Sequence, residues 1–120
     1  MSVFKRVTKK LLCPRCGDVL ADADYRPMAG SLALSAPGGH QLTPQMGAIH
    51  LRRAEQQLAA ADSTAGADEA RTRLDFIRHH IGEVIYDLPC PRGHHTLATA
   101  PQITRALRQA KGDWVSLNDA

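Results

Sequence analysis

Cys-Pro-Arg-Cys-Gly at residues 13–17 has a near-copy, Cys-Pro-Arg-Gly-His, at residues 90–94. The two stretches together contain all three cysteines of the chain. In the first stretch the proline fixes the backbone angle φ and the glycine tolerates a positive φ, so both thiolates can face one cation. In the second stretch a glycine replaces the second cysteine and a histidine follows. An imidazole is longer than a thiol side chain, so this histidine can reach the same centre from one residue further on.

The two stretches therefore predict one set of four metal ligands, which consists of Cys13, Cys16, Cys90 and His94. Three thiolates and one imidazole in a closed tetrahedral site favour zinc over magnesium or calcium. Two other interpretations are a redox pair formed by the first two cysteines and thiols that bind no metal. A redox pair usually follows a strand in a larger βαβ pattern, and it leaves the third cysteine unexplained.

The fourth ligand has two alternatives in the sequence. His95 directly follows His94 and could bind the metal in its place. His40 belongs to Pro-Gly-Gly-His at residues 37–40, which matches Pro-Arg-Gly-His at residues 91–94. An alanine stands where a ligand cysteine would precede this third copy, so a glycine turn before a helix is the better explanation of it.

The two cysteine-bearing stretches resemble the turns of the zinc-ribbon class, in which two CPxCG-like turns at the heads of β-hairpins clamp one zinc ion. The resemblance covers only residues 13–17 and 90–94, and no specific family is identified. The long separation and the histidine-containing second turn depart from the compact form with four cysteines. The resemblance implies a zinc-stapled fold of a kind often used to bind nucleic acid or the protein machines that handle it. It implies no enzymatic activity.

Period-two alternation and β-rich composition predict short strands, which lie at residues 19–21, 31–35, 83–88, 95–99 and 114–117. Thr43 and Pro44 predict the N-cap and the first residue of a helix. Its apolar stripe is formed by Gly47, Leu51, Ala54, Leu58 and Ala61. A second helix is expected to begin near Asp68 and end near Gly82, with a stripe of Ala70, Leu74, Ile77 and Ile81. A third helix is expected to run from Pro101 to about Ala110.

These elements predict an α+β fold: a split zinc ribbon with an inserted antiparallel helical hairpin and a C-terminal helix. We expect a single zinc-stapled domain, made of a basic arm (1–12), a first zinc turn and hairpin (13–36), the helical hairpin (44–82), and a second zinc turn with helix and tail (83–120). The metal would close a loop of more than seventy residues. Its loss is therefore expected to destabilise the whole domain.

Positive charge is concentrated in two segments, although the net charge is only +3. Residues 1–16 and 89–111 contain no acidic residue, whereas residues 17–88 are net acidic. We expect the metal to bring the two basic segments together and to create a phosphate-binding surface. Its candidate contacts are Lys5, Arg6, Lys9, Lys10, Arg15, Arg92, Arg105 and Arg108. Alternatively, these cations only keep the protein in solution or balance the negative charge of zinc-bound thiolates.

The sequence favours a binding protein over an enzyme. It contains no GxSxG, HExxH or phosphate-cradling glycine loop, and a zinc ion with four protein ligands has no position for substrate. If His94 were not a ligand, three thiolates and a water could support hydrolysis, with Glu83 or Asp87 as the base.

We expect a cytoplasmic protein without a membrane segment, since zinc-type thiols suit a reducing compartment. The expected partner is RNA or DNA, within an assembly such as a ribosome or a transcription complex. The alternative is an adaptor that binds another protein through the helical hairpin. The sequence predicts no oligomeric state.

Overall fold

The computed structural model describes residues 6–117 and divides into two compact units. The first unit combines the described residues up to Thr43 with those from Tyr86 onward, and the second unit is Pro44–Ile85. The described residues form three helices and two sheets, which confirms the α+β class. Within residues 6–117 no helix combines the length and the apolar character needed to cross a membrane. The single zinc-stapled domain stays a prediction.

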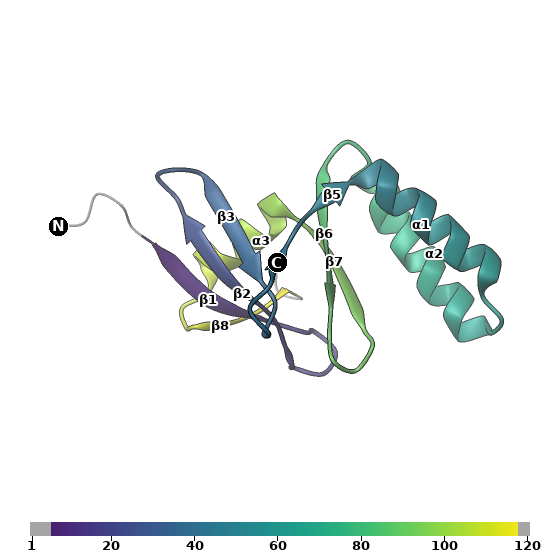
Figure 1. Ribbon diagram of the computed structural model, residues 1–120, viewed down its shortest axis with the longest axis horizontal. Coiled ribbons are helices and arrows are strands. Elements are labelled where there is room, and N and C mark those ends of the chain that lie inside the picture. Colours follow the sequence, from purple (N-terminus) through teal and green to yellow (C-terminus); the bar gives the residue numbers. More distant parts are fainter. Residues whose placement is uncertain (1–5, 118–120) are drawn as a thin grey trace. The chain divides into compact units, whose positions relative to one another are not determined.

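The first unit contains a five-stranded sheet (Figure 1). Its order is β4-β3-β2-β1-β8, and β8 lies parallel to β1 while the other neighbours are antiparallel. The strands are β1 (Val7–Leu12), β2 (Val19–Arg26), β3 (Ser31–Ser35), β4 (Gln41–Leu42) and β8 (Trp114–Ser116). β2, β3 and β8 agree with the strands expected from the sequence, and β2 extends further than predicted.

The strand β1 is a correction, because we expected only a basic arm before the first zinc turn. Along β1 the side chains of Val7, Lys9 and Leu11 are partly or fully buried, and those of Thr8 and Lys10 are exposed. Lys9 can occupy a partly buried position because its ammonium group donates to the carbonyl of Ala110 at 2.7 Å. Buried and exposed residues alternate along β1. Because Lys9 takes a buried position next to the exposed Lys10, the apolar residues alone do not show this alternation.

A β-hairpin and a helix complete the first unit. β6 (Val84–Pro89), which enters this unit at Tyr86, and β7 (His95–Thr99) were expected within a residue of these bounds, as was α3 (Ala100–Gln109). α3 begins in a capping box: Thr99 accepts from the Gln102 backbone N–H while the Gln102 side chain accepts from the Thr99 N–H. The core between these elements includes Leu11, Leu20, Leu34, Leu88, Ile103, Leu107 and Val115.

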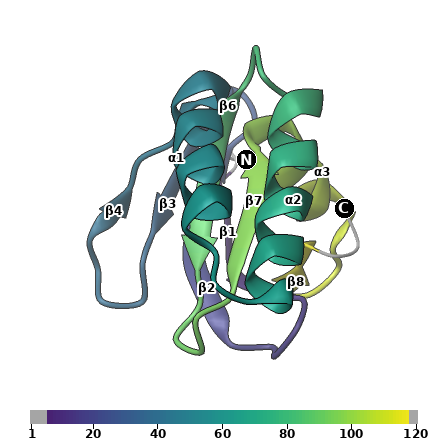
Figure 2. The same ribbon diagram turned by 90° about the vertical axis from the view of Figure 1, so that its right-hand side faces the viewer.

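The second unit contains the predicted pair of helices, α1 (Gly47–Ala60) and α2 (Thr64–His79). Figure 2 shows the two helices side by side, running in opposite directions. A two-residue strand, β5 (Gln45–Met46), pairs antiparallel with Val84 and Ile85 at the start of β6. This pairing was not expected from the sequence.

The helix boundaries differ from the prediction at three points. α1 begins after Met46 rather than at Pro44, because the intervening residues pair with β6. α2 begins earlier than predicted, since Ser63 is its N-cap and accepts from the Gly66 N–H at 3.1 Å. α2 also ends before Ile81, so the last residue of the expected apolar stripe is 42% exposed.

Candidate metal centre

The four predicted ligands lie together in the first unit. One ligand atom from each of Cys13, Cys16, Cys90 and His94 lies within 4.8 Å of every other. The Sγ atoms of Cys16 and Cys90 are 3.7 Å apart, and His94 Nδ1 is 3.7 Å from Cys13 Sγ and 3.5 Å from Cys90 Sγ. A tetrahedral zinc ion with about 2.3 Å bonds to sulfur and about 2.05 Å to nitrogen requires separations of about 3.8 Å and about 3.6 Å. The donor set therefore fits a zinc ion, with His94 as an Nδ1 ligand.

The first ligand turn connects β1 to β2. The Cys13 N–H donates to the Asp18 carbonyl at 2.8 Å, and the Gly17 N–H donates to the Cys13 carbonyl at 2.9 Å. Gly17 has a φ of +77°, a conformation that side chains other than glycine rarely adopt. This turn places Cys13 and Cys16 on the same side of the loop.

The second ligand turn connects β6 to β7 and is one residue shorter. The Cys90 N–H donates to the His94 carbonyl at 2.8 Å, and the Gly93 N–H donates to the Cys90 carbonyl at 3.0 Å. His94 thus closes its turn as Asp18 closes the first, and it does not occupy the position of Cys16. The longer imidazole compensates for this difference and reaches the three sulfur atoms.

The third copy of the motif, at residues 36–40, is a copy of backbone conformation only. The Ala36 N–H donates to the His40 carbonyl and the Gly39 N–H donates to the Ala36 carbonyl, both at 2.8 Å. This is the bonding pattern of the turn at residues 90–94, in a hairpin loop of the same length. His40 is exposed and lies outside the ligand cluster.

His95, the other alternative ligand, faces a different partner. Its Nδ1 atom lies 2.9 Å from Asp87 Oδ1. Asp87 is on β6 and His95 on β7, so this contact joins the two strands of the hairpin. Among the described residues, the geometry therefore selects His94 as the fourth ligand.

Burial and backbone hydrogen bonds shift the pKa values of two ligand thiols in opposite directions. Cys13 is 2% exposed and Cys90 is 6% exposed. Burial raises the pKa of Cys13, but hydrogen bonds from the backbone N–H groups of Arg15 and Cys16 outweigh it and bring this pKa down to about 7. The Asp18 backbone lowers the pKa of Cys16, yet burial and the neighbouring side chains raise it to about 11. A bound cation would favour the thiolate forms of these ligands.

Asp18 is a residue of the site that sequence reasoning missed. Its carboxylate lies 3.1 Å from Arg92 Nε and 3.5 Å from Cys16 Sγ. The ion pair with Arg92 links the first ligand turn to the second. The only signal in the sequence was its place directly after Gly17, where the chain re-enters a strand.

Several cations proposed for phosphate binding have carboxylate partners. The Arg6 guanidinium binds both oxygens of Asp24, at 2.9 and 2.7 Å, and Lys10 Nζ lies 2.7 Å from Asp22. The bond from Arg6, together with its charge, lowers the pKa of Asp24. The Lys10 pair joins β1 to β2, the Arg6 pair joins the residue before β1 to β2, and both cations are exposed. The charge on this part of the sheet is therefore mixed in sign.

The remaining candidates are distributed along the first unit. Arg108 donates to the Tyr25 hydroxyl at 2.8 Å, and Tyr25 pairs with Val7 at the start of β1. The six-residue strand β1 spans about 20 Å and leads to Cys13 at its other end. We expected Arg6 and Arg108 to lie near the metal turns. The structure does not place them there. The other candidates, Arg15 and Arg105, are exposed, and Lys5 lies outside the described residues.

Comparisons with protein-family models, with curated proteins and with solved structures each found no match to this chain. The functional interpretation therefore rests on the geometry and chemistry of the residues themselves.

Proposed function

We propose that Cys13, Cys16, Cys90 and His94 hold one structural zinc ion. The observation that carries this proposal is the agreement of three ligand-atom separations, 3.7, 3.7 and 3.5 Å, with the edges of a zinc tetrahedron. A zinc ion with four protein ligands has no open coordination position, so the site is not catalytic. The ion stabilises the fold by closing the loop between the two turns.

The arrangement of the turns supports the split zinc ribbon as the description of this fold. One turn joins β1 to β2 and the other joins β6 to β7, so each lies at the head of a hairpin. The second unit, Pro44–Ile85, is inserted between them in the sequence. Three thiolates and an imidazole also suit a protein that works in a reducing compartment, such as the cytoplasm.

We further propose that the protein is a binding module whose partner is another protein. Pairing of Arg6, Lys10 and Arg92 with aspartates leaves less uncompensated charge for a phosphate backbone than the sequence predicted. Large apolar side chains are exposed in both units, including Trp114 at 60% in the first and Ile49 at 49% in the second. Ile49 on α1 is an exposed apolar side chain with which an adaptor could contact a partner.

Recovery of the full-length protein from cells tests the partner class. After affinity capture, one half of the sample is treated with nuclease and the other half is left untreated, and zinc is measured in both. We expect specific protein partners to remain after nuclease treatment. Loss of every partner on nuclease treatment would contradict a protein partner.

Nucleic acid is the second candidate partner, and the acid-free segment of residues 89–111 favours it. A titration with labelled RNA and DNA at low salt tests this candidate directly. If α3 contacts phosphates, replacing Arg105 and Arg108 with glutamine should weaken binding for all sequences. Each lost contact should reduce the log-log salt slope by about 0.7 to 0.9.

A further inference from the structure

Within residues 6–117, no strand pairs with the outer edge of β8. β8 is the last strand of the five-stranded sheet and pairs with β1 in the register Leu11↔Val115. The Lys10 N–H donates to the Asp113 carbonyl at 2.8 Å. In a parallel ladder this bond directs the backbone groups of Val115 toward β1 and those of Trp114 and Ser116 outward. An open edge of this kind can pair with a further strand.

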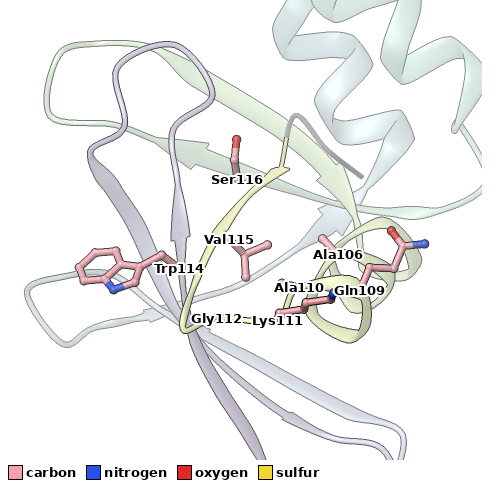
Figure 3. A pocket seen from close by; sticks show the side chains of 8 residues that line it. All are labelled: Ala106, Gln109, Ala110, Lys111, Gly112, Trp114, Val115 and Ser116. Atoms are coloured by element: carbon pink, nitrogen blue, oxygen red, sulfur yellow. The ribbon is translucent and has the colours of Figure 1, made fainter.

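A groove lies beside the open edge, between β8 and α3. Its volume is about 310 Å³, and its lining consists of Ala106, Gln109, Ala110, Lys111, Gly112, Trp114, Val115 and Ser116. Figure 3 shows the side chain of Val115 on the α3 side of the strand and that of Trp114 on the other side. The groove has room because α3 presents the small side chains of Ala106 and Ala110 there. It would hold about ten water molecules.

The lining indicates what kind of segment would fill the groove. The indole of Trp114 is 60% exposed and provides a large apolar contact on the outer side of β8. Among the lining residues, Lys111 carries the single charge, which is positive. α3 has no acidic residue, whereas Asp22 and Asp113 lie with Trp114 on the outer side of β8. A segment with carboxylates on the groove side and apolar side chains on the indole side therefore matches both the charge and the shape.

We propose that an acidic, extended peptide segment of a partner protein adds to β8 as a further strand. This inference rests on the proposed protein-binding function and names the site and the chemistry of the partner. The peptide backbone pairs with the outward groups of Trp114 and Ser116. Its side chains alternate between the groove, where a carboxylate pairs with Lys111, and the outer side of β8, where an apolar one contacts the indole of Trp114.

The test uses a fluorescein-labelled, terminally blocked hexapeptide of alternating valine and glutamate, titrated into zinc-loaded full-length protein. Anisotropy should rise to saturation, and the emission of the single tryptophan should shift to shorter wavelength. In a matched peptide, every second backbone nitrogen is methylated. This peptide keeps its charge but loses the N–H donors that would pair with β8. It should bind at least about tenfold more weakly, as should a peptide with lysine in place of glutamate.

Two variants of the protein test the edge and the groove separately. Ser116→Pro removes an outward N–H and leaves the bonds between β8 and β1 in place. Ala110→Leu fills the groove. Each should weaken peptide binding at least about tenfold. The matched control is Ala29→Leu, an exposed position in the turn between β2 and β3, which should bind like the wild type. Zinc content and circular dichroism confirm that each variant is folded.

Four results would overturn the proposal. The first two are the absence of peptide binding at millimolar concentration and binding of the methylated peptide as tight as that of the unmethylated one. The third is a protein dimer that Ser116→Pro dissociates. The fourth is an oligonucleotide that binds at Trp114 more tightly than the peptide does. The dimer would place a second copy on the edge, and the oligonucleotide would place nucleic acid there. If nuclease-resistant partners persist while Ser116→Pro and Ala110→Leu change nothing, the docking site is wrong and the protein-binding function stands.

Discussion

Removal of the metal should cost this protein a large part of its stability. Cys16 and Cys90 are 74 residues apart in the chain, and a zinc ion that joins them closes this loop. The chain entropy of a closed loop of this length corresponds to about 4 kcal/mol. Domains of this size are stable by about 5–15 kcal/mol, so a loss of about 4 kcal/mol is a large fraction of the total.

Urea unfolding with and without a zinc-selective chelator measures this loss. For a slope of about 2 kcal/mol per molar, the unfolding midpoint should fall by about 2 M when the chelator is present. The control is Cys16→Ser, which should already be destabilised and should respond little to the chelator. Equal midpoints for the wild-type protein with and without chelator would refute the reasoning, because no loop would then be closed by metal.

Three further predictions follow from the geometry. His94→Ala should release zinc while His95→Ala retains it, as metal analysis after dialysis can show; the reverse result would make His95 the ligand. Gly47→Ala should lower the free energy of unfolding by about 1–3 kcal/mol, because its Cβ would lie 2.6 Å from the Ile81 carbonyl oxygen. Gly82→Ala, which meets nothing within 4 Å, should change it little, and equal effects of the two would argue against this packing. Acidification should release zinc, since protons compete for thiolates and imidazole, and an indicator dye should record release as the pH falls rather than as it rises.

The ligand set could be predicted from the sequence because its information is local. Each turn carries its own cysteine, proline and glycine, and all three cysteines of the chain lie in these two turns. The sequence around His94 and His95 is weaker evidence for choosing between these two histidines. It depends on the contact of His95 with Asp87 across a hairpin, which only the register of two strands reveals.

Three strands, β1, β4 and β5, were missed, and each is defined by the strand with which it pairs. β1 exists because it pairs with β2 and β8, and its two lysines hide its alternation. β5 is two residues long and is defined by its partner β6, which displaces the start of α1. The phosphate-binding surface was inferred from charge in sequence order, but Asp22 and Asp24 on β2 are positioned opposite Lys10 and Thr8 of β1. The order of residues in the sequence does not show that these aspartates pair with the cations near and on β1.

Native mass spectrometry of the purified full-length protein tests the central claim most directly. We expect one zinc ion per chain, and we expect Cys90→Ser to lose both the ion and cooperative unfolding. A wild-type chain that is free of metal in zinc-containing medium and yet fully folded would contradict the structural role of the site.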